Sequence, residues 1–242
     1  MKSIIPNSLT ALNLFCGCIA VLSFLCEENL LGIILVFVAA IADFFDGFVA
    51  RLLKAQSELG KQLDSLADMV SFGFVPGTIL YVALLKTTNY SDFSELIENN
   101  EYIPFIGFLV TVFSGFRLAK FNIDTRQSTS FIGVPTPANT LFFLTIPLIW
   151  LNMEPTDFIF KVISNPSVLI VTTLLFSYLL IAEIPLIALK FKGVGLKENV
   201  FRYVLIVSGI ICTILLTYLA IPVILVFYIL LSIIENISAK KE

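Results

Sequence analysis

Residues 43–68 read DFFDGFVARLLKAQSELGKQLDSLAD, and this stretch decides what kind of protein the chain is. It carries four aspartates, Asp43, Asp46, Asp64 and Asp68, although strongly apolar sequence lies on both sides of it. An ionised carboxylate near the middle of a membrane helix costs on the order of 2.5 to 3.5 kcal/mol. Four unpaired carboxylates would oppose insertion by roughly 10 kcal/mol, so other groups have to neutralise them.

The composition of the whole chain is that of an integral membrane protein. Of its 242 residues, 58% are hydrophobic and 14% are charged, and the mean hydropathy is +0.97, well outside the range of soluble domains. The first apolar run lacks a convincing cleavage site, so we expect it to be retained as a helix. The apolar runs predict an all-α fold of about eight transmembrane helices, forming one polytopic domain over residues 1–242. The expected spans are residues 7–26, 30–54, 59–85, 102–121, 138–153, 167–189, 201–218 and 221–234.

The basic residues predict how these helices are oriented. With eight spans, both termini lie on one side, and the loops of that side hold all the lysines and arginines except Lys86 and Lys161. The positive-inside rule then places both termini and the loop between the second and third spans in the cytoplasm. We therefore expect a multi-pass protein of the cell (inner) membrane. A net charge of −3 and the absence of a basic soluble face argue against a nucleic-acid partner.

The four aspartates are spaced to form two acidic helical faces. Asp43 and Asp46 are three residues apart in the second expected span, and Asp64 and Asp68 are four apart in the third. Each pair therefore shares one face of its helix. The short polar link at 53–58 returns the chain antiparallel, so the two faces can converge. Small residues beside the aspartates let a helix or a ligand approach closely: Gly47, Ala50 and Gly60.

Converging carboxylates at this depth predict a divalent metal site. At about 1.5 Å per residue, Asp43 lies roughly 12 Å along its helix from Arg51, below the cytoplasmic surface. Arg51 and Lys61 supply at most two positive charges. Oxygen ligands without sulfur or nitrogen favour magnesium or manganese over zinc. The alternative is that the aspartates form ion pairs between helices with Arg51, Lys54 and Lys61.

The complete pattern resembles a known family signature. Residues 43–51 read DFFDGFVAR and residues 60–68 read GKQLDSLAD. Together they are similar to the DxxDGxxAR...GxxxDxxxD signature of the CDP-alcohol phosphatidyltransferases, and no position departs from it. The resemblance implies the membrane fold of that family and a divalent-metal reaction that moves a phosphatidyl group from a CDP-linked lipid to an alcohol, releasing CMP.

Three further segments resemble the phosphatidylserine synthase branch of that family. They are residues 6–13 (PNSLTALN), 117–122 (RLAKFN) and 131–137 (FIGVPTP). Lys120 stands where arginine is common in that branch, and Val134 stands where leucine is common. The resemblance implies CDP-diacylglycerol and L-serine as substrates, a membrane-lipid environment, and the homodimer that is common among relatives.

The resemblance also implies roles for individual residues. Two divalent cations, magnesium or manganese, would be held by Asp43, Asp46, Asp64 and Asp68, with Asp43 and Asp64 bridging both. Asp68 would also accept the proton of the serine hydroxyl. Direct displacement is expected, because the chain has no histidine and the unrelated phospholipase D-like serine synthases use histidine nucleophiles. The positions that match the family's CDP-lipid contacts are Asn7, Thr10, Gly47, Ala50, Arg51, Ser57 and Gly60.

Serine brings a carboxylate that needs a cationic partner. The candidates lie at the cytoplasmic end of the fourth expected span and in its loop, and Arg117 lies deepest among them. The alternative is that the cations of this group are topological anchors. Glu183 is a further charge near a helix end, for which we expect a pairing with Lys190. The candidate serine-binding residues are Arg117, Lys120, Asn122 and Arg126.

Two other functions fit part of the pattern. A sibling transferase that accepts glycerol 3-phosphate or inositol phosphate would call for more arginines than Arg117 and Arg126 to bind the acceptor's phosphate. A divalent cation transporter could also use intramembrane aspartates. It would need a charged path from face to face, whereas the acidic cluster of this sequence is confined to the cytoplasmic half.

Overall fold

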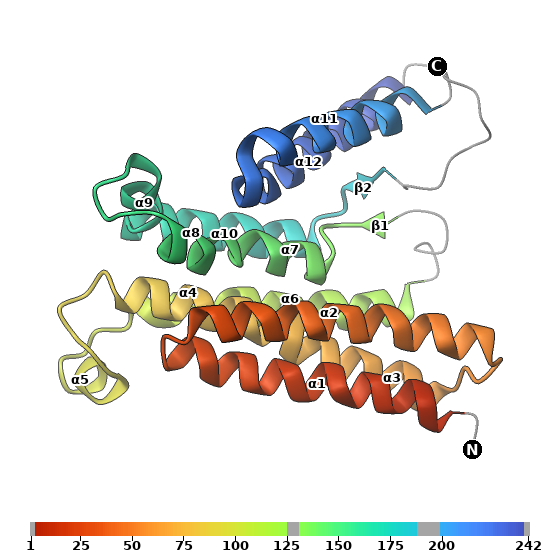
Figure 1. Ribbon diagram of the computed structural model, residues 1–242, viewed down its shortest axis with the longest axis horizontal. Coiled ribbons are helices and arrows are strands. Elements are labelled where there is room, and N and C mark those ends of the chain that lie inside the picture. The colour runs from red at the N-terminus through yellow and green to blue at the C-terminus, as the bar shows by residue number, and fades with distance from the viewer. Residues whose placement is uncertain (1–2, 125–130, 188–198, 240–242) are drawn as a thin grey trace.

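The structure is a computed structural model that describes residues 3–124, 131–187 and 199–239, and these residues are mostly helical (Figure 1). The elements of the first half are α1 (Ile4–Leu25), α2 (Asn29–Leu52), α3 (Glu58–Asp68), the π-helical η1 (Met69–Phe74), α4 (Val75–Leu85), α5 (Phe93–Glu98), the 3-10 helix η2 (Ile103–Phe108) and α6 (Leu109–Ile123). Those of the second half are β1 (Phe131–Ile132), α7 (Thr136–Phe143), α8 (Thr145–Asn152), α9 (Phe158–Ile163), α10 (Pro166–Ile181), β2 (Pro185–Leu186), α11 (Val200–Leu216), the 3-10 helix η5 (Thr217–Leu219) and α12 (Ala220–Ala239).

The helices form three tiers (Figure 1). The first contains α1, α2, the α3–α4 rod and α6; the second contains α7, α8 and α10; the third is the hairpin of α11 and α12. One apolar core joins the tiers and includes Phe24 of α1, Ile79 of α4, Phe143 of α7 and Ile229 of α12. The start of α1, the α2–α3 connection, the end of α6 and the end of α12 lie at the same end of the bundle.

The predicted all-α membrane fold is confirmed, apart from two very short strands. Within the described residues, five helical stretches are long and apolar enough to cross a membrane, and α10 is apolar but shorter. The last stretch contains both α11 and α12, which pack against each other on either side of η5. The number of eight spans stays a prediction. The five stretches are Ile4–Leu25, Asn29–Leu52, Glu58–Leu85, Ile103–Ile123 and Val200–Ile237.

The third expected span changes helix type part-way along. Pro76 has no N–H to donate and its ring crowds the carbonyl of Phe72, four residues earlier. The backbone widens there into the π-helical η1, which begins directly after α3. Thr140 of α7 donates to the Phe72 carbonyl and Thr111 of α6 donates to the Gly73 carbonyl, each at 2.9 Å. These hydroxyls supply the partners that a backbone needs inside a membrane.

Two expected helices are wrong in their extent, and proline explains both. The span predicted at 167–189 ends at Ile181, because Pro185 disfavours a helical conformation of the residue before it; the chain forms β2 instead. β2 pairs antiparallel with β1. The span predicted at 138–153 breaks at Leu144 into α7 and α8, since Pro147 crowds the carbonyl four residues before it.

Candidate active site

The helices α2 and α3 bring the four aspartates together, as their spacing predicted. Asp43, Asp64 and Asp68 each offer a carboxylate oxygen within 4.8 Å of the others. Asp46 lies on α2 one turn after Asp43, and its side chain is buried. The two acidic faces therefore form one cluster of carboxylates.

The helix α1 supplies polar side chains that hold two of these carboxylates. The Thr10 hydroxyl donates to Asp46 Oδ2 at 2.5 Å, and Asn13 Nδ2 donates to Asp68 Oδ1 at 3.3 Å. Asn13 is not among the predicted site residues. Its signal in the sequence is that it follows Thr10 by three residues on a mostly apolar helix, which places both side chains on one face.

The cluster fits a divalent cation such as magnesium or manganese. Its donors are carboxylate oxygens, the ligands that these ions prefer. Carboxylates at this spacing repel each other, and a cation between them offsets that repulsion. Within the parts of the chain that the structure describes, no lysine or arginine forms an ion pair with these aspartates. The alternative of ion pairs with Arg51, Lys54 and Lys61 is therefore not supported.

A cavity of about 500 Å³ opens beside the cluster, a size typical of small-molecule sites. Asp46 and Asp64 form part of its wall. The wall also includes residues for which the sequence carried no signal beyond their nearness to the motif, among them Gln56 and Glu58, and it includes Lys61, one of the two cations expected near the aspartates. Every position predicted to contact the CDP-lipid lines this cavity: Asn7, Thr10, Gly47, Ala50, Arg51, Ser57 and Gly60.

The local sequence explains the shape of the cavity wall. Ser57 is the N-cap of α3, and its hydroxyl accepts a hydrogen bond from the Gly60 backbone N–H at 3.0 Å. This cap places the positive end of the α3 dipole at the cavity, where it favours a phosphate group. A Cβ added at Gly47 would come no nearer than 3.8 Å to another residue, Arg51. The glycine therefore leaves open space for a ligand.

The match to known proteins agrees with this geometry. A family model described as CDP-alcohol phosphatidyltransferase matches residues 3–179. This chain belongs to that family. The matched region runs from the start of α1 into α10 and contains all four aspartates, whereas α11 and α12 lie outside it.

Curated relatives share one printed name. The CDP-diacylglycerol–serine O-phosphatidyltransferase of Bacillus subtilis (strain 168) is 33% identical over 184 residues, which are 74% of this chain and 88% of the relative. The protein of that name from Mycobacterium bovis is 30% identical over 234 residues, covering 93% of this chain and 75% of the relative. The one from Helicobacter pylori (strain J99) is 35% identical over 135 residues, covering 55% and 52%.

Arg117 is the predicted serine-binding residue whose position fits that prediction best. Its side chain is only 7% exposed, and its Nε donates to the Val134 carbonyl at 2.8 Å. Its guanidinium lies over the ring of Phe121, at 5.5 Å from the centroid. Arg117 is also close enough to Asp68 for their charges to interact. It therefore contacts Val134 of the 131–137 segment that resembles phosphatidylserine synthases, and its charge interacts with the acidic cluster.

Two of the other predicted serine-binding residues, Lys120 and Asn122, have side-chain partners elsewhere in the fold. Lys120 forms an ion pair with Glu183 at 2.9 Å. Asn122 donates from its side chain to the Ser65 hydroxyl at 2.8 Å, so it holds α6 against α3. Arg126 lies outside the described residues, as does Lys190, the expected partner of Glu183. The partners of Lys120 and Asn122 come from distant parts of the chain, so the sequence pattern could not indicate these contacts.

Proposed function

We propose that this protein transfers the phosphatidyl group of CDP-diacylglycerol to L-serine, forming phosphatidylserine and releasing CMP. The observation that carries the proposal is the convergence of Asp43, Asp64 and Asp68 within 4.8 Å beside a cavity lined by every predicted CDP-lipid position. Serine as the acceptor is supported by the names of the relatives and by the buried cation Arg117 near the cluster.

The cavity and an apolar groove on two of the same helices suit the two halves of a CDP-lipid. We propose that the diphosphate faces Arg51 and the N-terminus of α3, both of which favour negative charge. An apolar groove of about 290 Å³ lies between α1 and α2, on the helices that also line the cavity. An acyl chain in that groove would remain in an apolar environment. The groove is lined by Leu9, Leu12, Val38, Ile41, Ala42, Phe45 and Val49.

The four aspartates are proposed to hold two divalent cations, magnesium or manganese. Such ions offset the negative charge of a diphosphate and stabilise CMP as the leaving group. Asp43 and Asp64 would bridge the two ions, Asp46 would hold the first and Asp68 the second. The hydrogen bonds from Thr10 to Asp46 and from Asn13 to Asp68 keep two of these carboxylates oriented before substrate binds.

Asp68 is proposed to act as the general base. It accepts the proton of the serine hydroxyl as the hydroxyl oxygen attacks the phosphorus that bears the lipid. The new phosphorus–oxygen bond forms while the bond to CMP breaks, so CMP leaves without a covalent enzyme intermediate. This direct displacement inverts the configuration at phosphorus. Retention of configuration with a chiral CDP-lipid would contradict it.

We propose that the site faces the cytoplasm and that the protein is a homodimer of the cell membrane. The cavity is formed by the start of α1, the end of α2 and the start of α3, at the end of the bundle where α12 also ends (Figure 1). The positive-inside rule assigns this end to the cytoplasm, because Arg51, Lys61 and Lys120 lie near it.

The test is an assay of CMP release by the purified protein. We expect CMP when CDP-diacylglycerol, magnesium or manganese, and serine are all present, and none with glycerol 3-phosphate or inositol phosphate. CMP with one of those phosphates instead of serine would favour the sibling transferase. Metal flux into liposomes without CMP release would favour a transporter. We expect Asp64→Asn to abolish CMP release, while Glu98→Gln removes an exposed charge on the distant α5 and leaves it unchanged.

Serine binding is tested with Arg117→Ala and Lys120→Ala. Arg117 is buried near Asp68, whereas the charge of Lys120 is already paired with Glu183. We expect the KM for serine to rise at least about tenfold in Arg117→Ala, the loss of one charge-assisted hydrogen bond, and less than about threefold in Lys120→Ala. An unchanged KM for serine in Arg117→Ala would show that the assignment is wrong.

A further inference from the structure

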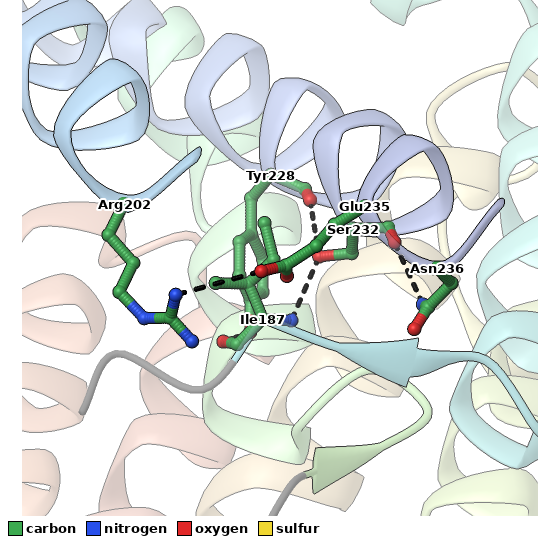
Figure 2. A network of polar contacts seen from close by, with 6 residues as sticks. All are labelled: Ile187, Arg202, Tyr228, Ser232, Glu235 and Asn236. Carbon is green, nitrogen blue, oxygen red and sulfur yellow. Dashed lines mark hydrogen bonds and ion pairs between the residues drawn. The ribbon is translucent and has the colours of Figure 1, made fainter. Parts of the chain in front are cut away.

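The hairpin of α11 and α12 lies outside the region that the family model matches, but it holds the segment that follows α10. Figure 2 shows side chains of α12 reaching this segment. Asn236 Nδ2 donates to the Pro185 carbonyl at 2.6 Å, and the Tyr228 hydroxyl donates to the Ile187 carbonyl at 2.9 Å. The Ile187 N–H donates to the Ser232 hydroxyl at 3.1 Å. The side chains of α12 therefore hold residues 185–187 through hydrogen bonds to their backbone.

The spacing of these side chains explains how one helix makes all three contacts. Tyr228, Ser232 and Asn236 are four residues apart, so they share one face of α12. Buried backbone groups outside a helix need hydrogen-bond partners, and this face supplies them to residues 185–187. The buried Arg202 of α11 forms an ion pair with Glu235 of α12 at 3.6 Å (Figure 2). The pair links the two helices, so the hairpin holds the segment as a unit.

The held segment is linked to Arg117 by a short series of hydrogen bonds. β2 pairs with β1, and directly after β1 the Gly133 N–H donates to the Ile184 carbonyl at 2.9 Å. The next residue, Val134, donates to the Leu179 carbonyl at 3.0 Å. The Val134 carbonyl in turn accepts the hydrogen bond from Arg117 Nε at 2.8 Å. A shift of β2 would therefore shift the Val134 carbonyl, which orients the Arg117 guanidinium.

We infer that the α11–α12 hairpin is a clamp that positions Arg117 for the acceptor substrate through β2 and β1. The inference rests on the proposed function and adds a role for the part of the chain outside the family match. Tyr228, Ser232 and Asn236 are positioning residues, since they contact the 185–187 backbone and not the cavity. The clamp governs affinity for the acceptor and leaves the binding of the CDP-lipid unchanged.

Steady-state kinetics of Asn236→Ala and Tyr228→Phe test the clamp. One hydrogen bond changes an equilibrium by about fivefold, so we expect the KM for serine to rise by about that factor in each variant. The KM for CDP-diacylglycerol should stay within about twofold. The matched control is Thr213→Val, which removes an exposed hydroxyl of α11 that donates to Gly209 of the same helix. It should change neither KM.

A double variant shows whether the effect passes through Arg117. If it does, Asn236→Ala causes no further rise in the KM for serine when Arg117→Ala is already present. The clamp is overturned if the full effect persists in that background, or if Asn236→Ala lowers kcat and the thermal midpoint without changing the KM for serine. The unsubstituted protein separates the two proposals. If it releases CMP with another alcohol and not with serine, the proposed function fails, and the same kinetics with that alcohol still test the clamp.

Discussion

Replacing Thr10 by valine tests whether α1 orients the acidic cluster. Valine keeps the shape of threonine but removes the hydroxyl that donates to Asp46 Oδ2 at 2.5 Å. Thr10 and Asp46 are 3% and 5% exposed, so water has little access to replace the lost donor. A hydrogen bond to a charged group contributes about 1.5 to 3 kcal/mol. At about 1.4 kcal/mol for each factor of ten, we expect kcat/KM to fall about 10- to 150-fold.

The assay is CMP release at varied concentrations of magnesium or manganese. If Thr10 orients a metal ligand, the metal concentration for half-maximal activity should rise in Thr10→Val, whereas Thr10→Ser should stay within a few-fold of the unsubstituted protein. Ser8→Ala is the matched control, because its exposed hydroxyl donates to the Ile4 carbonyl of the same helix. A kcat/KM within twofold in Thr10→Val, with Asp46→Asn inactive, would refute the reasoning.

Three further predictions concern metal, packing and a surface ion pair. Chelation should abolish CMP release, and added magnesium or manganese should restore it in the unsubstituted protein but not in Asp43→Asn; activity that survives chelation would exclude the metal proposal. Gly107→Ala should lower the free energy of unfolding by about 1 to 3 kcal/mol, because its Cβ would lie 2.7 Å from the backbone of α4. Gly209→Ala, whose Cβ would meet Ile224 Cδ1 at 3.9 Å, an ordinary packing distance, should stabilise by up to about 1 kcal/mol, and equal thermal midpoints for the two variants would contradict the packing. Lys120→Gln should change the free energy of unfolding by less than about 1 kcal/mol, since both partners of its ion pair with Glu183 are well exposed. A larger fall in this free energy, measured by thermal unfolding, would show that the ion pair stabilises the fold more than a surface pair does.

The acidic cluster could be predicted from the sequence because its geometry is mostly local. Three- and four-residue spacings place Asp43 with Asp46, and Asp64 with Asp68, on single helix faces. A link of a few residues then brings the two helices together. Asn13 was missed because its role depends on a contact with Asp68, 55 residues away. The helix expected at 167–189 was too long, because its end was predicted from apolar composition and the helix-ending effect of Pro185 was not taken into account.

The membrane class, the family and the four aspartates follow from the sequence, since composition, helical period and a contiguous motif are readable without tertiary contacts. The cations available near the site could be identified only from the tertiary structure. It pairs Lys120 with Glu183 and leaves Arg117 buried near Asp68. It also connects the α11–α12 hairpin to the site through β1 and β2. The physical reason is that these pairings join residues far apart in the chain, and their geometry is set by how whole helices pack.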